Sequence, residues 1–435
     1  MRKGESTKDS AEDASSVEKE AYHFISAVNT LSGKLENDKY ISFKENGEEL
    51  SGELVHSETS NKSVEYSIQD FKKNVTSKVS LFLRPRFDQI VLLVGSGGSV
   101  VPDDSPNHRN SKYGHIMSDL LADIESEPSL GTEQEYLSFK TMKKKAQCAD
   151  DNNLENILSQ LEKAEDFIPS DSKTKYSNTL IKIREIIKDK TKYNYDMQRM
   201  QHLALINSLN KRVKEGNKLS IVTTNYDTML EDAATEGKYT VFDGFTFTAN
   251  PEFDAKMFDW TLVKDVPNLD TKELIYDKKV INLLKLHGSL TWKKPTNDES
   301  IRKISKENND EPLMIFPSSK KYEQSYRAPY SDLFYKFREL LNRPRTLLLT
   351  VGFSFEDFHI FEMVNDAILH NDGLSLLFTD INIGSEKPSN DSNLGKLKQR
   401  MSEGYRVAFL KATLNNTSVN ELENLIKYLE PDNND

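Results

Sequence analysis

Short apolar runs alternate with amphipathic segments along most of the chain after residue 86. The first run, Ile90–Val94, lies in FDQIVLLVGSGGS and ends abruptly in a glycine-rich turn, and apolar residues then recur at helical spacing over 116–124. A run of this kind is typical of a buried parallel strand. We therefore predict a strand, a loop and a helix in this order.

The same alternation continues after residue 216. The apolar runs are LSIVTTNYD, INLLKLHGS, PLMIFP, TLLLTVGFSF, LSLLFTDI and YRVAFLKA, and the helical patterns between them include MLEDAATEG, YSDLFYKFRELLN, HIFEMVNDAIL and SVNELENLIKYLE. Strands that alternate with helices over this length indicate an α/β protein. We predict a Rossmann-like open parallel sheet with helices on both faces.

Other parts of the chain depart from this alternation. Between about 130 and 216 the pattern is helical and charged, which predicts a helical insertion in the main domain, 86–415. Residues 1–20 have almost no large apolar side chains and predict a disordered N-terminal tail. We interpret 21–85 as an N-terminal extension of mixed structure, and 416–435 as a C-terminal helix and tail.

Composition and charge exclude several classes of function. The 58 basic and 69 acidic residues give a net charge of −11, which disfavours direct binding of nucleic acid through its phosphates. No stretch approaches the roughly 18 apolar residues needed to cross a bilayer, and the N-terminus lacks a secretory signal. We expect a cytoplasmic protein without membrane contact. The single cysteine, Cys148, excludes an internal disulfide and any zinc site built on two or more thiolates.

Polar residues gather at the carboxyl ends of four predicted strands, where ligands bind in open α/β sheets. GSGGS follows Val94, TTNYD follows Val222, HGS follows Leu286 and GFSFEDFH follows Val351. The glycines of the first cluster would let the backbone approach a phosphate and present N–H groups to it. It is not the full dinucleotide fingerprint, because Val100 stands where G-x-G-x-x-G has its third glycine.

Each cluster also has an ordinary structural interpretation. Asn225 and Asp227 suit turns and helix caps, Asp357 can cap a helix, and a single histidine such as His287 is more often structural than catalytic. Four such clusters at four strand ends are hard to explain as caps alone, so we predict one shared nucleotide site. Its candidate residues are Gly95, Ser96, Gly97, Ser99, Thr224, Asn225, Asp227, His287, Gly288, Gly352, Ser354 and Asp357.

The four clusters resemble, in order and spacing, the motifs of the sirtuins. The longer strings TTNYDTMLEDAA, LKLHGSLTW, FPSSKKY and GFSFEDFHI are similar to the prokaryotic sirtuin-like NADases of anti-phage defence. Within that group, they look most like the sirtuin-like subunit that works with a HerA-type ATPase. The resemblance covers roughly residues 86 to 415.

The resemblance implies roles for individual residues. Asn225 takes the place of the asparagine that positions water or ribose hydroxyls, and His287 takes the place of the general base. Asp227 matches the aspartate on the nicotinamide side. The remaining matches are the phosphate loop, Gly95, Gly97 and Ser99, and the late loop of the adenine-side ribose and phosphate, Gly352 and Ser354.

Two departures from the deacetylase pattern change the expected reaction. The Pro-Asp-Phe-Arg segment is reduced here to Pro102 and Asp103, which makes Asp103 a further candidate for the site. Deacetylase sirtuins hold a structural zinc on four cysteines, and this chain has one cysteine, so no structural zinc is expected. The resemblance therefore implies hydrolysis of NAD to nicotinamide and ADP-ribose, which would deplete cellular NAD as an abortive infection response.

Two alternatives stay open at this stage. The same pocket would serve a regulatory module that senses NAD or ADP-ribose without turning it over, and an NAD-dependent protein deacylase is a further, weaker alternative. The resemblance also implies a homo-oligomer that docks on a hexameric HerA-type ATPase. An uncontrolled NADase would damage its own cell, so we expect a latent state, whose trigger the sequence does not identify. The residues require no metal for the hydrolytic step.

Overall fold

The computed structural model describes most of the chain. The described residues are 19–37, 39–51, 54–57, 60–63, 66–102, 113–130, 135–264, 275–295, 300–315, 328–383, 392–415 and 421–430. The candidate Asp103 and the segment FPSSKKY lie outside them.

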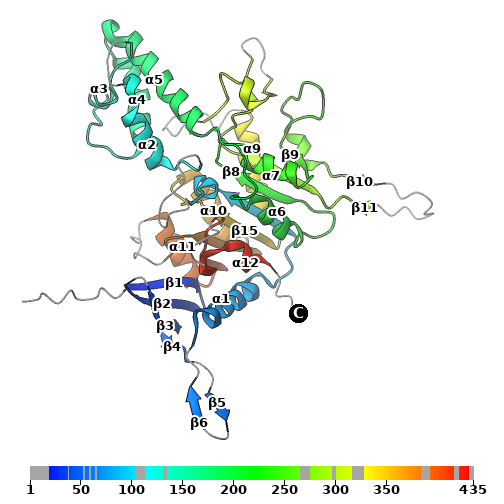
Figure 1. Cartoon of the computed structure of the whole chain (residues 1–435). Helices are drawn as coiled ribbons and strands as arrows, with labels where there is room; N and C mark the ends of the chain where they lie inside the picture. The colour runs from blue at the N-terminus through cyan, green and yellow to red at the C-terminus, as the bar shows by residue number, and fades with distance from the viewer. Residues whose placement is uncertain are drawn as a thin grey trace, which may run out of the picture.

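A single large sheet runs through the molecule (Figure 1). It has 11 strands in the order β4-β3-β2-β1-β17-β16-β15-β7-β8-β12-β9, and the pairs from β17 to β9 are parallel. These parallel strands are β7 (Gln89–Val94), β8 (Leu219–Thr223), β9 (Thr240–Phe242), β12 (Val280–Lys285), β15 (Thr346–Val351), β16 (Leu374–Asp380) and β17 (Val407–Lys411). The predicted open parallel sheet is confirmed.

Helices cover both faces of this sheet because its strands are apolar on both sides. In β7, Ile90 and Leu92 belong to one hydrophobic core, whereas Val91 and Leu93 belong to the other. The first core contains side chains from α1 (Ile68–Leu83), α6 (His202–Asn210), α7 (Met229–Glu236) and α12 (Leu425–Leu429). The second contains side chains from α9 (Tyr330–Leu341), α10 (Phe358–His370) and α11 (Asn393–Ser402). This layered arrangement also agrees with the prediction.

The N-terminal extension continues the main sheet. Its strands are β1 (Lys19–Ser26), β2 (Thr30–Glu36), β3 (Lys39–Glu45) and β4 (Glu48–Glu49), which pair antiparallel, and β1 pairs antiparallel with β17. Helix α1 packs on these strands, with the rings of Phe43 and Phe71 stacked 4.4 Å apart between their centroids. A hairpin of β5 (Leu54–Ser57) and β6 (Ser60–Ser63) projects from this end (Figure 1). The extension and the parallel strands therefore share one core.

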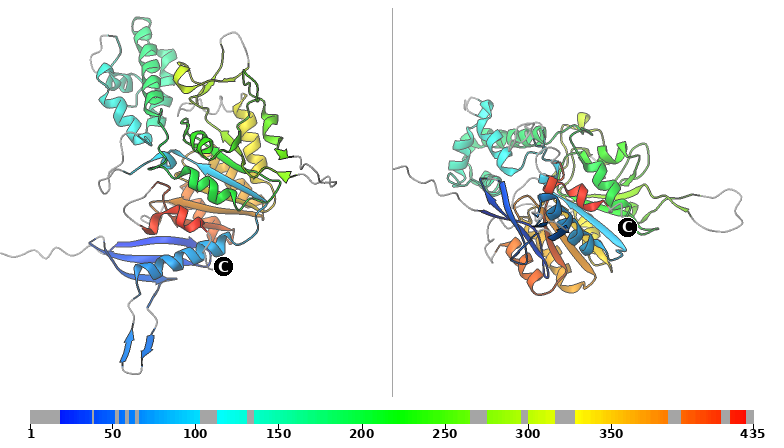
Figure 2. Two further views of the ribbon diagram at one scale, coloured as in Figure 1. Left: turned by 45° about the vertical axis from the view of Figure 1, so that its right-hand side comes forward. Right: turned by 60° about the horizontal axis from the view of Figure 1, so that its bottom comes forward.

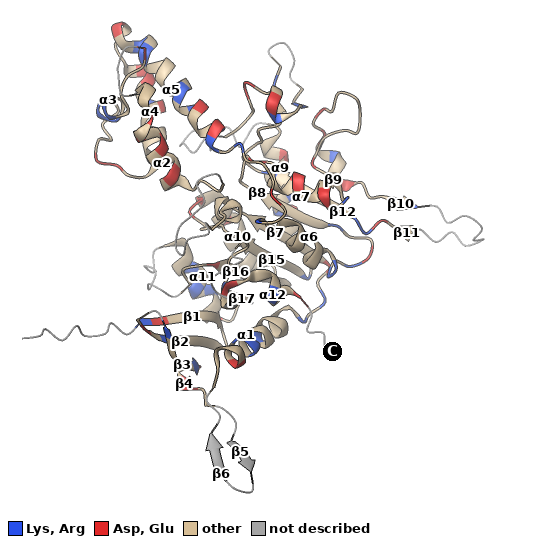
Figure 3. Ribbon diagram, in the orientation of Figure 1, with Lys and Arg blue, Asp and Glu red and all other residues tan. Residues whose placement is uncertain are grey.

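The helical insertion has a core of its own. It consists of α2 (Met117–Ser126), α3 (Phe139–Lys145), α4 (Leu154–Ala164) and α5 (Ser170–Lys190). The sequence pattern places the insertion at about 130–216, but the helices that share this core begin earlier, with α2, and α6 packs on the sheet instead. Figures 1 and 2 show the insertion at the opposite end of the molecule from β1–β4, and Figure 3 shows charges of both signs along α5.

Short elements complete the described structure. They are β10 (Val263–Lys264), β11 (Ile275–Tyr276), β13 (Trp292–Lys293), β14 (Arg302–Lys303), and the 3-10 turns η1 (Ser96–Ser99), η2 (Pro128–Leu130), η3 (Glu165–Phe167), η4 (Ala255–Asp259), η5 (Lys306–Asn308) and η6 (Glu421–Glu423). Within the described ranges, the helices are too short or too polar to span a bilayer.

The strand order reverses at β7. From β7 the chain fills the sheet on one side with β8, β9 and β12, and it then crosses to the other side with β15, β16 and β17. In open α/β sheets, the crevice outside the carboxyl ends of the strands at such a switch point is the usual ligand site. The loops that follow β7, β8, β12 and β15 all start at this edge.

Candidate functional site

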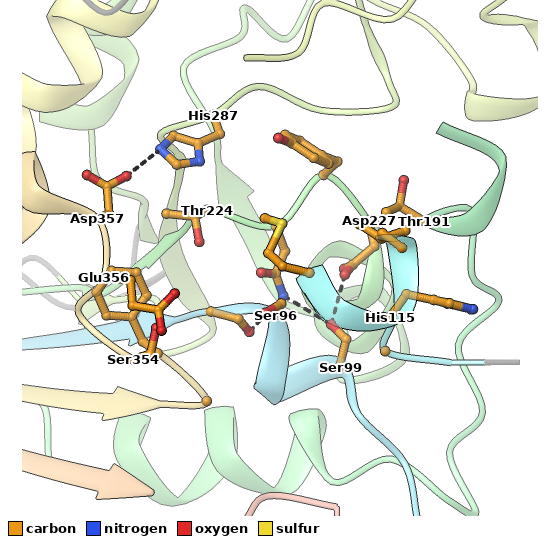
Figure 4. A pocket seen from close by; sticks show the side chains of 18 of the residues that line it. Ser96, Ser99, His115, Thr191, Thr224, Asp227, His287, Ser354, Glu356 and Asp357 are labelled. Atoms are coloured by element: carbon orange, nitrogen blue, oxygen red, sulfur yellow. Dashed lines mark hydrogen bonds and ion pairs between the residues drawn. The ribbon is translucent and has the colours of Figure 1, made fainter. Parts of the chain in front are cut away.

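A cavity lies at the switch point, between these strand ends and the helical insertion (Figure 4). The candidate residues that line it are Gly95, Ser96, Ser99, Thr224, Asn225, Asp227, His287, Gly352, Ser354 and Asp357. Gly97 and Gly288 do not line it. The structure therefore brings residues from all four polar clusters to one cavity.

Glycines allow the loops after β7 and β15 to pack backbone against backbone. Gly352 has a φ of +58°, and a Cβ atom added to it would lie 2.1 Å from the backbone nitrogen of Gly98. A Cβ atom on Gly97 would lie 2.8 Å from Gly352 Cα, and the Gly97 N–H donates to the Gly352 carbonyl over 3.0 Å. Gly97 therefore supports the close approach of the two loops rather than facing the cavity.

Hydrogen bonds join the loop after β8 to the glycine loop. The side-chain nitrogen Nδ2 of Asn225 donates to the Gly95 carbonyl over 3.0 Å and to Ser99 Oγ over 3.1 Å. Ser99 Oγ in turn donates to Asp227 Oδ2 over 2.8 Å. Asn225, Ser99 and Asp227 thus form one buried chain of polar groups at the cavity wall.

Asp227 is buried, and burial raises the pKa of its carboxyl group, opposed by the positive charge of Lys285 and the hydrogen bond from Ser99. Its other oxygen accepts the Met229 N–H over 3.1 Å, so the turn-forming role expected of this residue is also present. The carboxylate thus has a structural partner at one oxygen and a cavity partner at the other.

Lys285 supports this loop from strand β12. Its side chain is 2% exposed, and Nζ donates to the Asp227 carbonyl and, over 2.9 Å, to Glu231 Oε1. Lys285 is not among the candidate site residues predicted from the sequence. A lysine within an otherwise apolar strand, LLKLHG, is the pattern that could have found it, because such a residue needs a buried partner.

His287 and Asp357 form the second polar pair of the cavity. His287 Nε2 lies 3.2 Å from Asp357 Oδ2, which is an ion-pair contact. Asp357 Oδ1 accepts the backbone N–H groups of His359 and Ile360, which makes Asp357 the N-cap of α10. Gly288 shapes the preceding turn: its φ is +86°, and an added Cβ would lie 2.2 Å from the Leu313 carbonyl oxygen.

The loop after β15 lines the cavity with each of its residues from Gly352 to Asp357 except Phe355. Ser354 and Glu356 line it, whereas the ring of Phe355 is buried in the second core against Phe353, Phe361 and Phe378. Phe355 has a φ of +60°, which is unfavourable for a bulky residue and is maintained here by the surrounding packing. Glu356, which the sequence analysis did not assign, thus joins the carboxylates of the cavity (Figure 4).

The helical insertion forms the opposite wall. Its lining residues are Gly114, His115, Met117, Leu120, Glu155, Thr191 and Tyr193. Tyr193 Oη accepts the His115 backbone N–H over 2.7 Å, and burial together with the negative charge of Asp227 raises the pKa of the Tyr193 phenol. Lys306 Nζ donates to the Tyr193 carbonyl over 2.8 Å and ties this wall to the main domain. These residues do not follow predicted strands, so the sequence pattern does not predict them as part of the site.

The cavity therefore combines three kinds of group. Serine hydroxyls lie at its glycine loop, an amide side chain lies at Asn225, and an imidazole paired with a carboxylate lies at His287. The N–H groups of Gly95, Gly97 and Gly98 donate to backbone carbonyls and hold the loop in place. Within the described ranges there is no group of three or more His, Cys, Asp or Glu side chains arranged to hold a metal ion. These groups suit a polar ligand whose reacting part needs a proton acceptor.

Fold and site together define an α/β protein of the Rossmann-like type with its cavity at the topological switch point. Residues 219–383 match the SIR2-like domain family. The matched region runs from β8 to just beyond β16 and contains Asn225, His287 and Gly352, so it supports a sirtuin-like protein. SIR2-like domains are generally NAD-dependent enzymes, which supports an NAD-related activity. No curated protein matches the chain.

Proposed function

We propose that this protein hydrolyses the bond between nicotinamide and ribose in NAD, giving nicotinamide and ADP-ribose. The observation that carries the proposal is that Asn225 and His287, from neighbouring strands, line the same cavity as the glycine loop after β7. Neither side chain is needed merely to hold a phosphate. A polar amide and a proton acceptor at one end of a phosphate-binding crevice suit a reaction at the adjoining ribose.

The chemistry places modest demands on the protein. The nicotinamide nitrogen is already cationic, so it leaves neutral, with the electron pair of the broken bond, and needs no acid. The main requirements are orientation of NAD and stabilisation of an oxocarbenium-like ribose. Asp227 and Glu356 are carboxylates at the cavity that contribute negative charge to this stabilisation.

Water completes the reaction at the ribose carbon. In this mechanism Asn225 holds the water or the ribose hydroxyls, and His287 accepts the proton that the water releases as its oxygen bonds to that carbon. The proton then passes to solvent. A positioned base of this kind contributes typically about 10²- to 10⁴-fold in rate. No metal enters these steps.

The proposed biological setting rests on the resemblance of the four motifs to the prokaryotic sirtuin-like NADases of anti-phage defence. It comprises depletion of cellular NAD in anti-phage defence, a cytoplasmic homo-oligomer, and a hexameric ATPase of the HerA type as partner. A latent enzyme that is activated by this partner would explain how the host cell tolerates it. Co-purification with such an ATPase and stimulation of NAD consumption by it are the corresponding tests.

One observation favours a second function, an NAD- or ADP-ribose-sensing module. Both hydrogen bonds of the Asn225 side chain hold neighbouring loops together, a role that a binding protein would also require. In that case NAD would bind tightly and remain intact after long incubation, with the partner ATPase as well as without it.

The decisive experiment measures nicotinamide release from NAD by the purified full chain, alone and with the ATPase. Asn225→Ala and His287→Ala should abolish release. Matched controls are Asn342→Ala and His370→Ala, which change the same residue types at exposed positions outside the cavity and should retain it. Undiminished release in both cavity variants contradicts the assignment, and consumption that depends on an acylated peptide would point to a deacylase.

A further inference from the structure

The two oxygens of the Asp357 carboxylate contact different groups of the described residues. Oδ1 accepts the N–H groups of His359 and Ile360 over 3.1 and 3.3 Å, and Oδ2 lies 3.2 Å from His287 Nε2. The side chains of His287 and Asp357 are 8% and 9% exposed. Helix α10 therefore fixes the rotation of the carboxylate, and the carboxylate presents its second oxygen to the imidazole.

We infer that Asp357 is a positioning residue for His287: it keeps the ring proton on Nε2 and thereby leaves Nδ1 as the proton-accepting nitrogen. An ionised carboxylate can only accept hydrogen bonds, so a ring nitrogen held 3.2 Å from it is favoured in its protonated form. The same negative charge stabilises the imidazolium once Nδ1 has accepted a proton. This role goes beyond the sequence analysis, which includes Asp357 only as a helix cap or as a candidate residue of the shared site.

Because Asp357 caps α10, the orientation of the side chain in Asp357→Asn can be predicted. Asparagine is as good an N-cap as aspartate, and in Asp357→Asn the amide oxygen would be retained by the N–H groups of α10. The amide nitrogen would then face His287 Nε2 and donate to it. Nε2 would become the acceptor and the ring proton would move to Nδ1, so the nitrogen needed for catalysis would be blocked while the helix cap remains.

Asp357 is not the only ionisable group near the ring, so the test must keep the others unchanged. Among the described residues, the other titratable groups at the cavity are His115, Glu155, Tyr193, Tyr226, Asp227 and Glu356, and Tyr330 from α9 lies against Gly288. Asp357→Asn leaves all of them in place. A second variant, Asp357→Ser, also preserves capping but is too short to contact the ring, so it removes the carboxylate without reversing the tautomer.

The first measurement needs no turnover. Nitrogen NMR of the full chain labelled at histidine, with the His287 signals assigned through His287→Gln, reports which ring nitrogen carries the proton and at which pH the ring titrates. We expect a proton on Nε2 in the unmodified protein and on Nδ1 in Asp357→Asn. The imidazole pKa should fall by about one unit in both Asp357 variants, because a neighbouring opposite charge is lost. An unchanged tautomer and titration would overturn the inference.

The second measurement is the pH dependence of nicotinamide release, and this arm rests on the proposed function. In Asp357→Asn, kcat should fall by roughly 10²-fold or more, with KM much less affected. In Asp357→Ser, the acidic limb of the kcat profile should move to lower pH, since a less basic ring stays neutral further into acid. The matched control is Asp254→Asn, because Asp254 is an exposed N-cap residue that does not line the cavity. This variant should change neither kcat nor the pH profile of kcat.

The two measurements distinguish failure of the positioning role from failure of the proposed hydrolase function. If the tautomer reverses but the unmodified protein consumes no NAD, the positioning role stands and the hydrolase proposal fails. Suppose instead that the protein hydrolyses NAD and that His287→Ala abolishes this hydrolysis. If Asp357→Asn then has the same kcat, His287 tautomer and His287 titration as the unmodified protein, the hydrolase proposal stands and the positioning role is wrong. Equal loss of thermal stability in Asp357→Asn and Asp357→Ala would show that asparagine does not preserve the cap of α10. In that case the His287 titration in Asp357→Ser tests the positioning role.

Discussion

Asn225 donates a hydrogen bond of 3.1 Å to Ser99 Oγ, although 126 positions separate the two residues in the chain. The Ser99 hydroxyl in turn donates a hydrogen bond to Asp227 Oδ2. The loops after β7 and β8 are therefore one hydrogen-bonded unit, and the amide that is proposed to hold water or ribose hydroxyls is oriented by the glycine loop.

Ser99→Ala tests this unit. The substitution removes the hydroxyl donor from the buried Asp227 and the acceptor from Asn225, and an unsatisfied buried group of this kind costs about 1–3 kcal/mol of unfolding free energy. We expect a loss of that size in urea denaturation, together with reduced kcat for nicotinamide release. Ser402→Ala, which removes an exposed hydroxyl, should do neither. Full activity in Ser99→Ala would mean that Asn225 is oriented by other contacts.

Gly352→Ala tests the contact between the loops after β7 and β15. The φ of +58° alone makes alanine unfavourable by about 1–2 kcal/mol, and the new Cβ would also meet the backbone of Gly98 at 2.1 Å. Gly404→Ala is the matched control, because its φ is +94° but its Cβ would have open space. Thermal or urea denaturation should therefore show a clearly greater loss for Gly352→Ala, by roughly 1–3 kcal/mol. Equal losses would mean that the two loops separate easily.

Lys285→Met tests the buried support beneath Asp227. Removing one partner of a buried ion pair is destabilising by roughly 3–5 kcal/mol, since Glu231 is left without its partner. Adding Glu231→Gln should recover part of the loss, which a double-mutant cycle measures. Lys264→Met, at an ion pair whose lysine is 67% exposed, should remain within about 1 kcal/mol of the unmodified protein. If the changes in unfolding free energy caused by Lys285→Met and Glu231→Gln are strictly additive, the two side chains are not directly coupled.

Stability should fall on mild acidification because of two buried histidines. Burial lowers the pKa of His202 to about 4, and burial with the positive charge of Lys411 lowers the pKa of His23 to about 3. Between these values and about 6.5, the unfolded chain binds protons that the folded protein does not, so the free energy of unfolding decreases as pH falls. Each histidine contributes up to about 1.4 kcal/mol per pH unit in this window.

His202→Leu isolates one of these contributions. Neither ring nitrogen of His202 has a hydrogen-bond partner among the described residues, so an apolar side chain removes no such bond. Urea denaturation at several pH values between 7.5 and 4.5 should show a shallower fall in stability for the variant. Curves that remain parallel down to pH 4.5 would show that His202 is not the source.

Local patterns predicted the sheet and the positions of its ends. An apolar run such as Ile90–Val94 is buried on both faces wherever it lies in a parallel sheet, and the polar residue that follows it marks the carboxyl end. Because all carboxyl ends of a parallel sheet share one edge, the prediction that Asn225 and His287 meet at one cavity required no knowledge of the strand order. The Asn225 and His287 roles themselves stay predictions.

Relationships across the cavity could not be predicted in this way. The pairing of His287 with Asp357 depends on how far the loop after β15 extends beyond its strand, which depends in turn on the packing of Phe355. His115 and Tyr193 lie on the insertion, where nothing in the spacing distinguishes cavity residues from core residues. The continuation of the sheet into β1–β4 was also not evident, because short antiparallel strands carry a weak pattern.

The separate core of the helical insertion has a consequence for how this protein can diverge. Part of one cavity wall, including Leu120, belongs to a module with its own packing, and the opposite wall belongs to the sheet that carries Asn225 and His287. Substitutions in the module can alter the size and polarity of this part of the wall without changing the cores that hold the strand ends. Selection on access and selection on chemistry can therefore proceed independently, and relatives of this chain are expected to vary most between α2 and α5.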